Sequence, residues 1–158
     1  MSDGTRPSWD DYFVGLMHEI GKRGTCNRGK SGCLIVKDNR ILTTGYVGSA
    51  PGMPHCDDED HYIKKVIEDD GSIKEHCVRT IHAEQNAICQ AARHGISIMG
   101  ATVYCKMEPC RTCAQLIIAS GIKRVVAYKR YHAAQDTRDL FTGVGMELKV
   151  IVDEIEKY

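Results

Sequence analysis

The spacing of apolar residues along the chain predicts alternating helices and strands. After Ser8, apolar positions recur three and four residues apart up to about Ile20, a pattern typical of an amphipathic helix. Two runs rich in β-branched residues follow at 32–37 and 40–46. The two residues between these runs are Asp and Asn, which favour a tight turn, so the runs are expected to form a hairpin.

The second half of the chain continues this alternation. The expected elements are a helix over 82–93, a strand over 101–106, a helix over 109–120, a strand over 124–129, a short helix over 137–141 and a strand over 147–152. Gly95 and Gly121 stand where the two longer helices should end. The order α-β-β-α-β-α-β-α-β predicts a three-layer α/β/α protein with a central mixed five-stranded sheet.

Residues 47–80 break the pattern. They are rich in Gly, Pro and acidic residues and have no clear period, apart from a stretch at 62–71 that is expected to form a short helix. We interpret 47–80 as a loop-rich insertion within a single domain spanning residues 1–158. A loop of this length is usually functional or is held in place by something.

Composition narrows the class of protein. Of the 158 residues, 21 are Lys or Arg and 21 are Asp or Glu, so the formal net charge is zero. A basic nucleic-acid footprint is therefore not expected, although a single nucleotide needs only a few cations. The sequence has no apolar run of roughly 18 residues and no signal-peptide core, so neither a membrane partner nor export is expected. In a cytoplasmic protein, eight cysteines suggest metal ligands, core residues or reactive thiols rather than disulfides.

Two cysteines and a histidine form a candidate metal site. Cys110 and Cys113 form a C-x-x-C directly after Pro109, at the start of a predicted helix. Residues three apart share a helix face, so both sulfurs can point at one object, either as a redox pair or as half of a metal site. His82, at the start of another predicted helix, favours the metal. Two thiolates and one imidazole leave a fourth position for water, which is typical of catalytic Zn²⁺.

Glu84 supplies the remaining group. It stands two residues after His82, where it could reach a zinc-activated water without binding the metal. H-x-E followed by P-C-x-x-C is the signature of zinc deaminases. In that chemistry hydroxide generated at the zinc attacks C4 of a pyrimidine or C6 of a purine, and Glu84 carries the proton to the ring and then to the departing amino group.

With these residues in view, the chain resembles the cytidine deaminase superfamily, and in particular its deoxycytidylate deaminases. The resemblance is carried by the stretches 25–36, 43–56, 77–88 and 108–126. It implies the cytidine-deaminase-like fold and hydrolysis of dCMP to dUMP and ammonia, which supplies dUMP for thymidylate synthesis. It also implies a homo-hexamer activated by dCTP and inhibited by dTTP, with Mg²⁺ accompanying the nucleotide effectors.

Several members of that family carry a second, structural zinc, and the residues here suggest one as well. Cys26, Cys56 and Cys77 lie in loop-like segments, and His76 or His55 could complete a closed tetrahedral set that clamps the insertion. The alternative is that these cysteines are free thiols. The other three cysteines lie in apolar segments and are expected in the core: Cys33, Cys89 and Cys105.

Substrate and effector residues are expected from the resemblance and from charge. The substrate candidates are Arg28 and Lys106 for the phosphate, Tyr131 over the base, and Ala83 within the H-A-E motif. The effector candidates are Gly45, Tyr46, Val47 and Gly48, which stand where the family has Gly-Tyr-Asn-Gly, with Arg93 at a subunit contact. Valine replaces the asparagine whose amide would hold a sugar hydroxyl.

Two other functions remain open at this point. One is a different zinc deaminase, acting on a free nucleoside or on tRNA adenosine, although the zero net charge disfavours tRNA and the insertion disfavours the shorter nucleoside enzymes. The other is a non-catalytic zinc module that binds nucleotides. Glu84 speaks against that module, because a structural zinc site does not need a carboxylate beside an open position.

Overall fold

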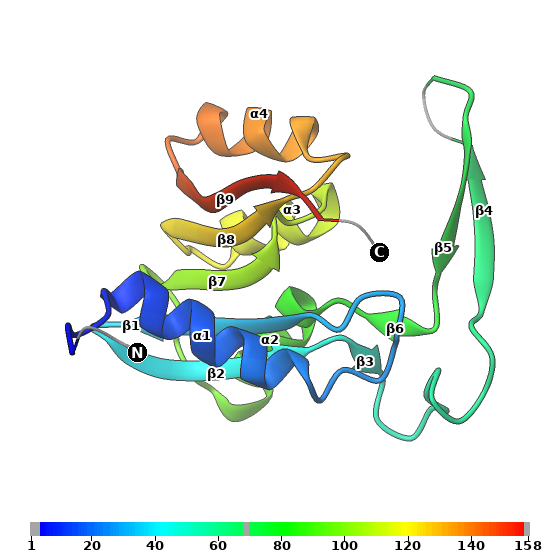
Figure 1. Cartoon of the computed structure of the whole chain (residues 1–158), viewed down its shortest axis with the longest axis horizontal. Coiled ribbons are helices and arrows are strands. Elements are labelled where there is room, and N and C mark those ends of the chain that lie inside the picture. The colour runs from blue at the N-terminus through cyan, green and yellow to red at the C-terminus, as the bar shows by residue number, and fades with distance from the viewer. Residues whose placement is uncertain (1–3, 68–69, 157–158) are drawn as a thin grey trace.

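A central five-stranded sheet organises the protein (Figure 1). The computed structural model describes residues 4–67 and 70–156. The sheet has the order β2-β1-β7-β8-β9, made of β1 (Gly32–Lys37), β2 (Arg40–Tyr46), β7 (Thr102–Met107), β8 (Arg124–Arg130) and β9 (Glu147–Ile155). β1 runs antiparallel to both β2 and β7, whereas β7, β8 and β9 are parallel to one another. The expected mixed sheet is confirmed.

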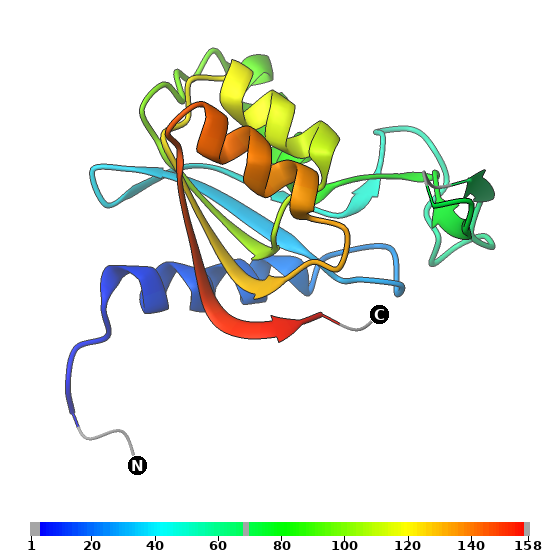
Figure 2. The same cartoon turned by 90° about the horizontal axis from the view of Figure 1, so that it is seen from above.

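Helices cover both faces of the sheet (Figure 2). One face is covered by α1 (Trp9–Gly21), and the other by α2 (Ala83–His94), α3 (Arg111–Ala119) and α4 (Gln135–Gly143). The core under α1 contains Phe13, Met17, Leu34, Tyr104 and Val126. The core under the other three helices contains Ala87, Ala91, Val103, Ile117, Val125 and Phe141. Apolar side chains thus face both sides of the sheet, and the predicted three layers are present.

The β1–β2 hairpin turns as the sequence predicts. Asp38 and Asn39 both adopt positive φ, at 50° and 57°, and Lys37 pairs with Arg40 across the turn. Asp and Asn tolerate this left-handed conformation better than most residues, and such a two-residue turn matches the twist of the strands.

The insertion is more regular than predicted. The stretch 62–71 does not form a helix: β4 (Ile63–Ile67) pairs antiparallel with β5 (Ile73–Cys77). Its Ile and Val side chains are β-branched, which favours strand over helix. Figure 1 shows this hairpin extending away from the central sheet. At its base β3 (Gly48–Ser49) pairs with β6 (Thr80–Ile81) and brings both ends of the insertion together.

The topology gathers several segments at one edge of the sheet. β7 and β8 are parallel, so the residues that follow them, Glu108 and Tyr131, leave the sheet at the same edge. Crevices outside the carboxyl ends of parallel strands are the usual place for ligands in α/β proteins. Within the described part of the chain, no helix is long and apolar enough to cross a membrane.

Candidate metal centre and substrate pocket

The starts of two helices bring the candidate ligands together. His82 is the N-cap of α2, with extended backbone, and its N–H donates to Gln85 Oε1 at 3.1 Å. Cys110 is the N-cap of α3, and Cys113 lies in the first turn of that helix. Because helix N-termini favour negative charge, this placement suits thiolates.

The spacing of the three side chains fits one tetrahedral metal ion. His82 Nδ1 lies 3.6 Å from Cys110 Sγ and 3.4 Å from Cys113 Sγ. Typical zinc bond lengths and a tetrahedral angle give a nitrogen–sulfur separation of about 3.6 Å. Cys113 is buried whereas His82 is exposed, so the centre is reached from the pocket side.

The charges of these groups depend on one another. A hydrogen bond from Cys113, together with one from His82, lowers the pKa of Cys110 to about 4. The same bond to Cys110, with burial, raises the pKa of Cys113, while the contact with Cys110 raises the pKa of His82 to about 9. The hydrogen bonds among these three side chains therefore stabilise a thiolate at Cys110 beside the imidazole of His82.

Glu84 is buried next to this centre. Its side chain comes from the first turn of α2, and Oε2 lies 3.9 Å from Cys113 Sγ. Only 9% of the residue is exposed. Burial raises the pKa of its carboxyl group, against the opposing effect of His82. A carboxylate at this position can exchange a proton with a group in the pocket.

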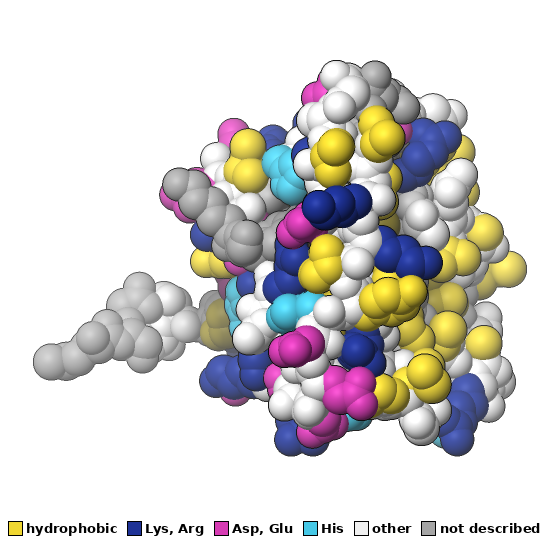
Figure 3. All heavy atoms as spheres, turned by 90° about the vertical axis from the view of Figure 1, so that its right-hand side faces the viewer, with side chains coloured by type: hydrophobic (Ala, Val, Ile, Leu, Met, Phe, Trp, Pro, Cys, Tyr) yellow, Lys and Arg dark blue, Asp and Glu magenta, His cyan; other side chains and the backbone are white. Residues whose placement is uncertain are grey.

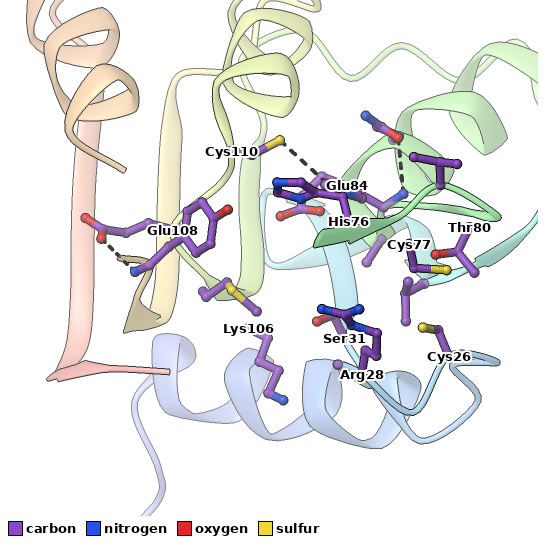
Figure 4. Close-up of a pocket in the computed structure, with 18 of the residues that line it drawn as sticks. Cys26, Arg28, Ser31, His76, Cys77, Thr80, Glu84, Lys106, Glu108 and Cys110 are labelled. Atoms are coloured by element: carbon purple, nitrogen blue, oxygen red, sulfur yellow. Dashed lines mark hydrogen bonds between the residues drawn. The ribbon is translucent and has the colours of Figure 1, made fainter. Parts of the chain in front are cut away.

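A pocket of about 430 Å³ opens in front of the metal ligands. Its lining includes Glu84, Cys110, Arg28, His76 and Tyr131, and Figure 4 shows how the labelled side chains lie around it. The volume lies within the range usual for small-molecule sites. The pocket is therefore large enough for a single nucleotide.

The predicted substrate residues all line this pocket, but only one of its two predicted cations is paired with a carboxylate. Ala83 is 1% exposed. Arg28 Nη2 donates to the Glu75 carbonyl at 3.1 Å, a bond that leaves its charge unneutralised. Lys106 Nζ instead lies 2.9 Å from Glu156 Oε1, so its charge is paired with a carboxylate near the end of β9.

The predicted effector residues do not form one group. Val47 is buried and lines the pocket, and its N–H donates to the Ser31 carbonyl at 3.0 Å. Tyr46 is 38% exposed, and its carbonyl accepts from Asn86 Nδ2 at 2.8 Å. Gly45 lies against α2, and Gly48 lies in β3. Arg93 is exposed near the end of α2, away from the pocket.

A second cluster of possible metal ligands lies where the insertion meets the loop before β1. Cys26, Cys56, His61 and Cys77 bring their ligand atoms within 4.8 Å of one another. Cys26 Sγ lies 3.7 Å from His61 Nδ1, and Cys56 Sγ lies 3.6 Å from Cys77 Sγ. The other ring nitrogen of His61 contacts Asn27 Oδ1 at 2.9 Å, which orients Nδ1 toward the sulfurs.

The fourth member of this cluster is thus His61, and the expectation of His55 or His76 is wrong. His55 Nδ1 contacts Thr25 Oγ1 at 3.0 Å. His76 lines the pocket, as its neighbour Cys77 in β5 also does, but His76 does not belong to the group of ligand atoms that Cys77 forms with Cys26, Cys56 and His61. Of the cysteines expected in the core, Cys33 and Cys105 are buried but Cys89 is exposed on α2.

Sequence reasoning also missed Glu108. It is 1% exposed and accepts hydrogen bonds from Arg130 and Arg138. Burial opposes ionisation, but the bonds from Arg138 and the Tyr131 N–H lower the pKa of Glu108. Its position directly before Pro109 was visible in the sequence, but the two arginines lie 22 and 30 residues further along the chain.

The face that bears the hairpin carries mixed charge. Figure 3 shows basic, acidic and histidine side chains interspersed over it. This agrees with the zero net charge of the whole chain.

Comparison with known proteins agrees with this geometry. Residues 7–129 match the model of the cytidine and deoxycytidylate deaminase zinc-binding region. The ComE operon protein 2 of Bacillus subtilis strain 168 is 38% identical over 151 residues, which cover 96% of this chain and 73% of that protein. The deoxycytidylate deaminase of Mycobacterium phage D29 is 39% identical over 125 residues, covering 77% of this chain and 95% of the phage protein.

A solved structure shows the same fold. The dCMP deaminase of cyanophage S-TIM5, in complex with dCMP and dUMP, has a TM-score of 0.71 and 26% sequence identity. The match covers 92% of this chain and 98% of the cyanophage chain. Together with the family match and the convergence of His82, Cys110 and Cys113, this shows that the chain belongs to the zinc-dependent cytidine and deoxycytidylate deaminase family.

Proposed function

We propose that this protein hydrolyses dCMP to dUMP and ammonia. The observation that carries the proposal is the buried Glu84 carboxylate beside the three candidate zinc ligands, on the wall of a nucleotide-sized pocket. The choice of dCMP is supported by the similarity to the deoxycytidylate deaminase of phage D29 and to the cyanophage enzyme solved with dCMP and dUMP.

In this proposal His82, Cys110 and Cys113 hold Zn²⁺, and Glu84 moves the protons. When bound, the zinc acts as a Lewis acid that makes a water nucleophilic near neutral pH. Glu84 takes one proton from the attacking water and gives it to the ring nitrogen next to C4. It then takes the second proton from the new C4 hydroxyl and gives it to the amino group, so the C4–N bond breaks, ammonia leaves and C4 keeps a carbonyl oxygen. The carboxylate is regenerated, so one residue serves both transfers.

Arg28 is the favoured phosphate-binding residue in this proposal. It lines the pocket, and the bond it makes within the protein is to a neutral carbonyl. A guanidinium can bind two phosphate oxygens at once. Lys106 is less suited, because a phosphate would have to displace or share Glu156. Tyr131 lies on the pocket wall and is assigned to the base.

The proposal is tested by comparing substrates in one assay. Purified zinc-loaded protein is incubated with dCMP, CMP, dCTP, deoxycytidine and a tRNA stem-loop, and ammonia release is measured. dCMP should give the highest kcat/KM. Faster turnover of deoxycytidine, or of adenosine in the stem-loop, would assign the protein to another group of zinc deaminases. Zinc binding with no turnover would favour a non-catalytic module.

We also propose the regulation and assembly that the resemblance implies. The protein is then a cytoplasmic homo-hexamer that supplies dUMP for thymidylate synthesis, activated by dCTP with Mg²⁺ and inhibited by dTTP. Arg93 is assigned to a subunit contact, and 45–48 to the effector site. The assay above, repeated with each effector, tests the regulation. The molar mass, measured by light scattering as the protein elutes from a size-exclusion column, tests the assembly.

A second zinc is proposed at Cys26, Cys56, His61 and Cys77. Three sulfurs and one imidazole form a closed tetrahedral set of the structural type. Cys26 precedes β1, Cys56 and His61 lie between β3 and β4, and Cys77 ends β5, so a metal ion here would join the insertion to the loop before β1. Its role would be to hold the base of the β4–β5 hairpin beside the pocket.

A further inference from the structure

Glu108 lies buried between the metal centre and α4. Its side chain is 0% exposed, and both oxygens bind the guanidinium of Arg138, with Nε to Oε1 at 2.8 Å and Nη2 to Oε2 at 2.8 Å. Arg130 Nη1 adds a third bond, at 3.2 Å. Two parallel bonds from one planar guanidinium fix the orientation of a carboxylate more strictly than a single contact does.

The same carboxylate holds the backbone at Tyr131. Glu108 Oε2 accepts the Tyr131 N–H at 3.0 Å, a bond drawn in Figure 4, and the Glu108 N–H donates to the Lys129 carbonyl at 3.0 Å. Glu108, the first residue after β7, is therefore bonded to Tyr131, the first residue after β8. Tyr131 lines the pocket directly beyond this point.

α4 contacts the segment that precedes the metal ligands at a second position. Thr137 Oγ1, fully buried, donates to the Pro109 carbonyl at 2.8 Å. Pro109 stands between Glu108 and the metal ligand Cys110. One short helix thus holds both the Glu108–Pro109 segment and, through Glu108, the pocket wall at Tyr131.

We propose that Glu108 and Arg138 are positioning residues for nucleotide binding, which act by holding Tyr131 at the pocket wall. The inference rests on the dCMP deaminase activity proposed above. A side chain that contacts substrate and transition state alike contributes uniform binding, so its misplacement raises KM more than it lowers kcat. Arg138 is the better residue to change, because its side chain is 33% exposed and its loss leaves Glu108 paired with Arg130.

The test compares Arg138→Met with a matched arginine on the opposite face of the sheet. Arg124 makes the equivalent two-bond contact with Asp10, at 2.8 and 2.9 Å, remote from the pocket. Arg138→Met should raise the KM for dCMP by about tenfold with kcat changed less than threefold. Arg124→Met should lower the melting temperature but leave KM unchanged. Zinc content is measured for every variant.

A double mutant separates positioning from general structural support. If Arg138 acts through Tyr131, adding Arg138→Met to Tyr131→Ala should not raise KM beyond the single tyrosine variant. Arg138→Lys, which keeps the charge but loses the two-bond geometry, should give an intermediate KM and serves if the methionine variant does not fold. Additive effects on KM, or an unchanged KM in both Arg138 variants, would overturn the inference. An inactive wild-type protein would instead overturn the proposed function.

Discussion

His82 Nδ1 lies 3.4 Å from Cys113 Sγ although the two residues stand at the starts of different helices, 31 positions apart in the chain. The centre is built where α2 and α3 begin side by side at the same edge of the sheet. Extended residues at both N-caps turn the ligand side chains toward each other, and the first turn of each helix supplies one more functional group, Glu84 and Cys113.

Replacing Glu84 with glutamine should stop turnover without removing the metal. The amide keeps the shape of the side chain but cannot accept and return a proton, so kcat for dCMP should fall by about 10²–10⁴-fold. Zinc content, measured by elemental analysis, should stay equal to the wild type. Glu19→Gln is the control, since Glu19 is an exposed α1 carboxylate paired with Lys22. Near-normal kcat in Glu84→Gln would contradict the assigned proton transfer.

Replacing His61 should remove one metal ion per chain. Elemental analysis of the wild type should give two zinc ions, and His61→Ala should give one, because three sulfurs remain but the tetrahedral set is incomplete. The insertion should then be cut faster by protease. His55→Ala is the matched control, since His55 contacts Thr25 instead of the cluster. One zinc in the wild-type protein would rule the second site out.

The sequence predicts the metal centre better than it predicts the insertion, for a physical reason. His82, Cys110 and Cys113 lie within short motifs whose helix-start context is local, so their grouping can be inferred. His61 reaches Cys26 across 35 positions that include the β1–β2 hairpin and β3, and no periodic pattern records that contact. The choice of helix over hairpin at 62–71 failed for a related reason. A short stretch has too few residues for period to outweigh β-branched propensity.

The network around Glu108 shows the same limit on the scale of a single residue. From the sequence alone, a single Glu before Pro109 would be expected to lie on the surface. Only the fold brings Arg138 from α4 and Arg130 from β8 to it. The sequence shows that acidic and basic residues are equal in number. Which of them form buried ion pairs depends on the order of the strands in the sheet.

The ionised Asp10 carboxylate stabilises the fold, so the free energy of unfolding should fall in acid as this group is protonated. Its carboxylate accepts bonds from Arg124, Lys149 and Tyr104, and the bond from Arg124 outweighs burial to hold its pKa well below the usual range. Because the folded pKa is lower than the unfolded pKa, the unfolded chain binds more protons in acid. The stabilisation is therefore complete above the unfolded pKa, and it is lost as the pH falls below about 4.

Asp10→Asn should accordingly lower the free energy of unfolding at pH 7 by about 1.5–3 kcal/mol, the range for hydrogen bonds to charged groups. Urea denaturation at pH 7 and pH 3 measures it, and the difference from the wild type should shrink at pH 3. Asp38→Asn is the control, because Asp38 is exposed in a turn that asparagine also adopts. A difference independent of pH would mean that the charge of Asp10 is not its source.

Gly45 should not tolerate a side chain, because α2 packs directly on β2 there. A Cβ at Gly45 would lie 2.5 Å from Ala87 N and closer still to the Ala83 carbonyl oxygen, and these backbone atoms cannot move without the helix. Gly45→Ala should cost about 1–3 kcal/mol of unfolding free energy. Since α2 carries Glu84, kcat/KM should fall as well.

Gly15→Ala is the matched change in an open position, with no atom within 4 Å of the new Cβ. It should be neutral or stabilise α1 by about 0.5–1 kcal/mol through helix propensity. The melting temperatures of both variants and of the wild type test this prediction. Equal melting temperatures for Gly45→Ala and the wild type would show that α2 can move away from β2 without loss of stability.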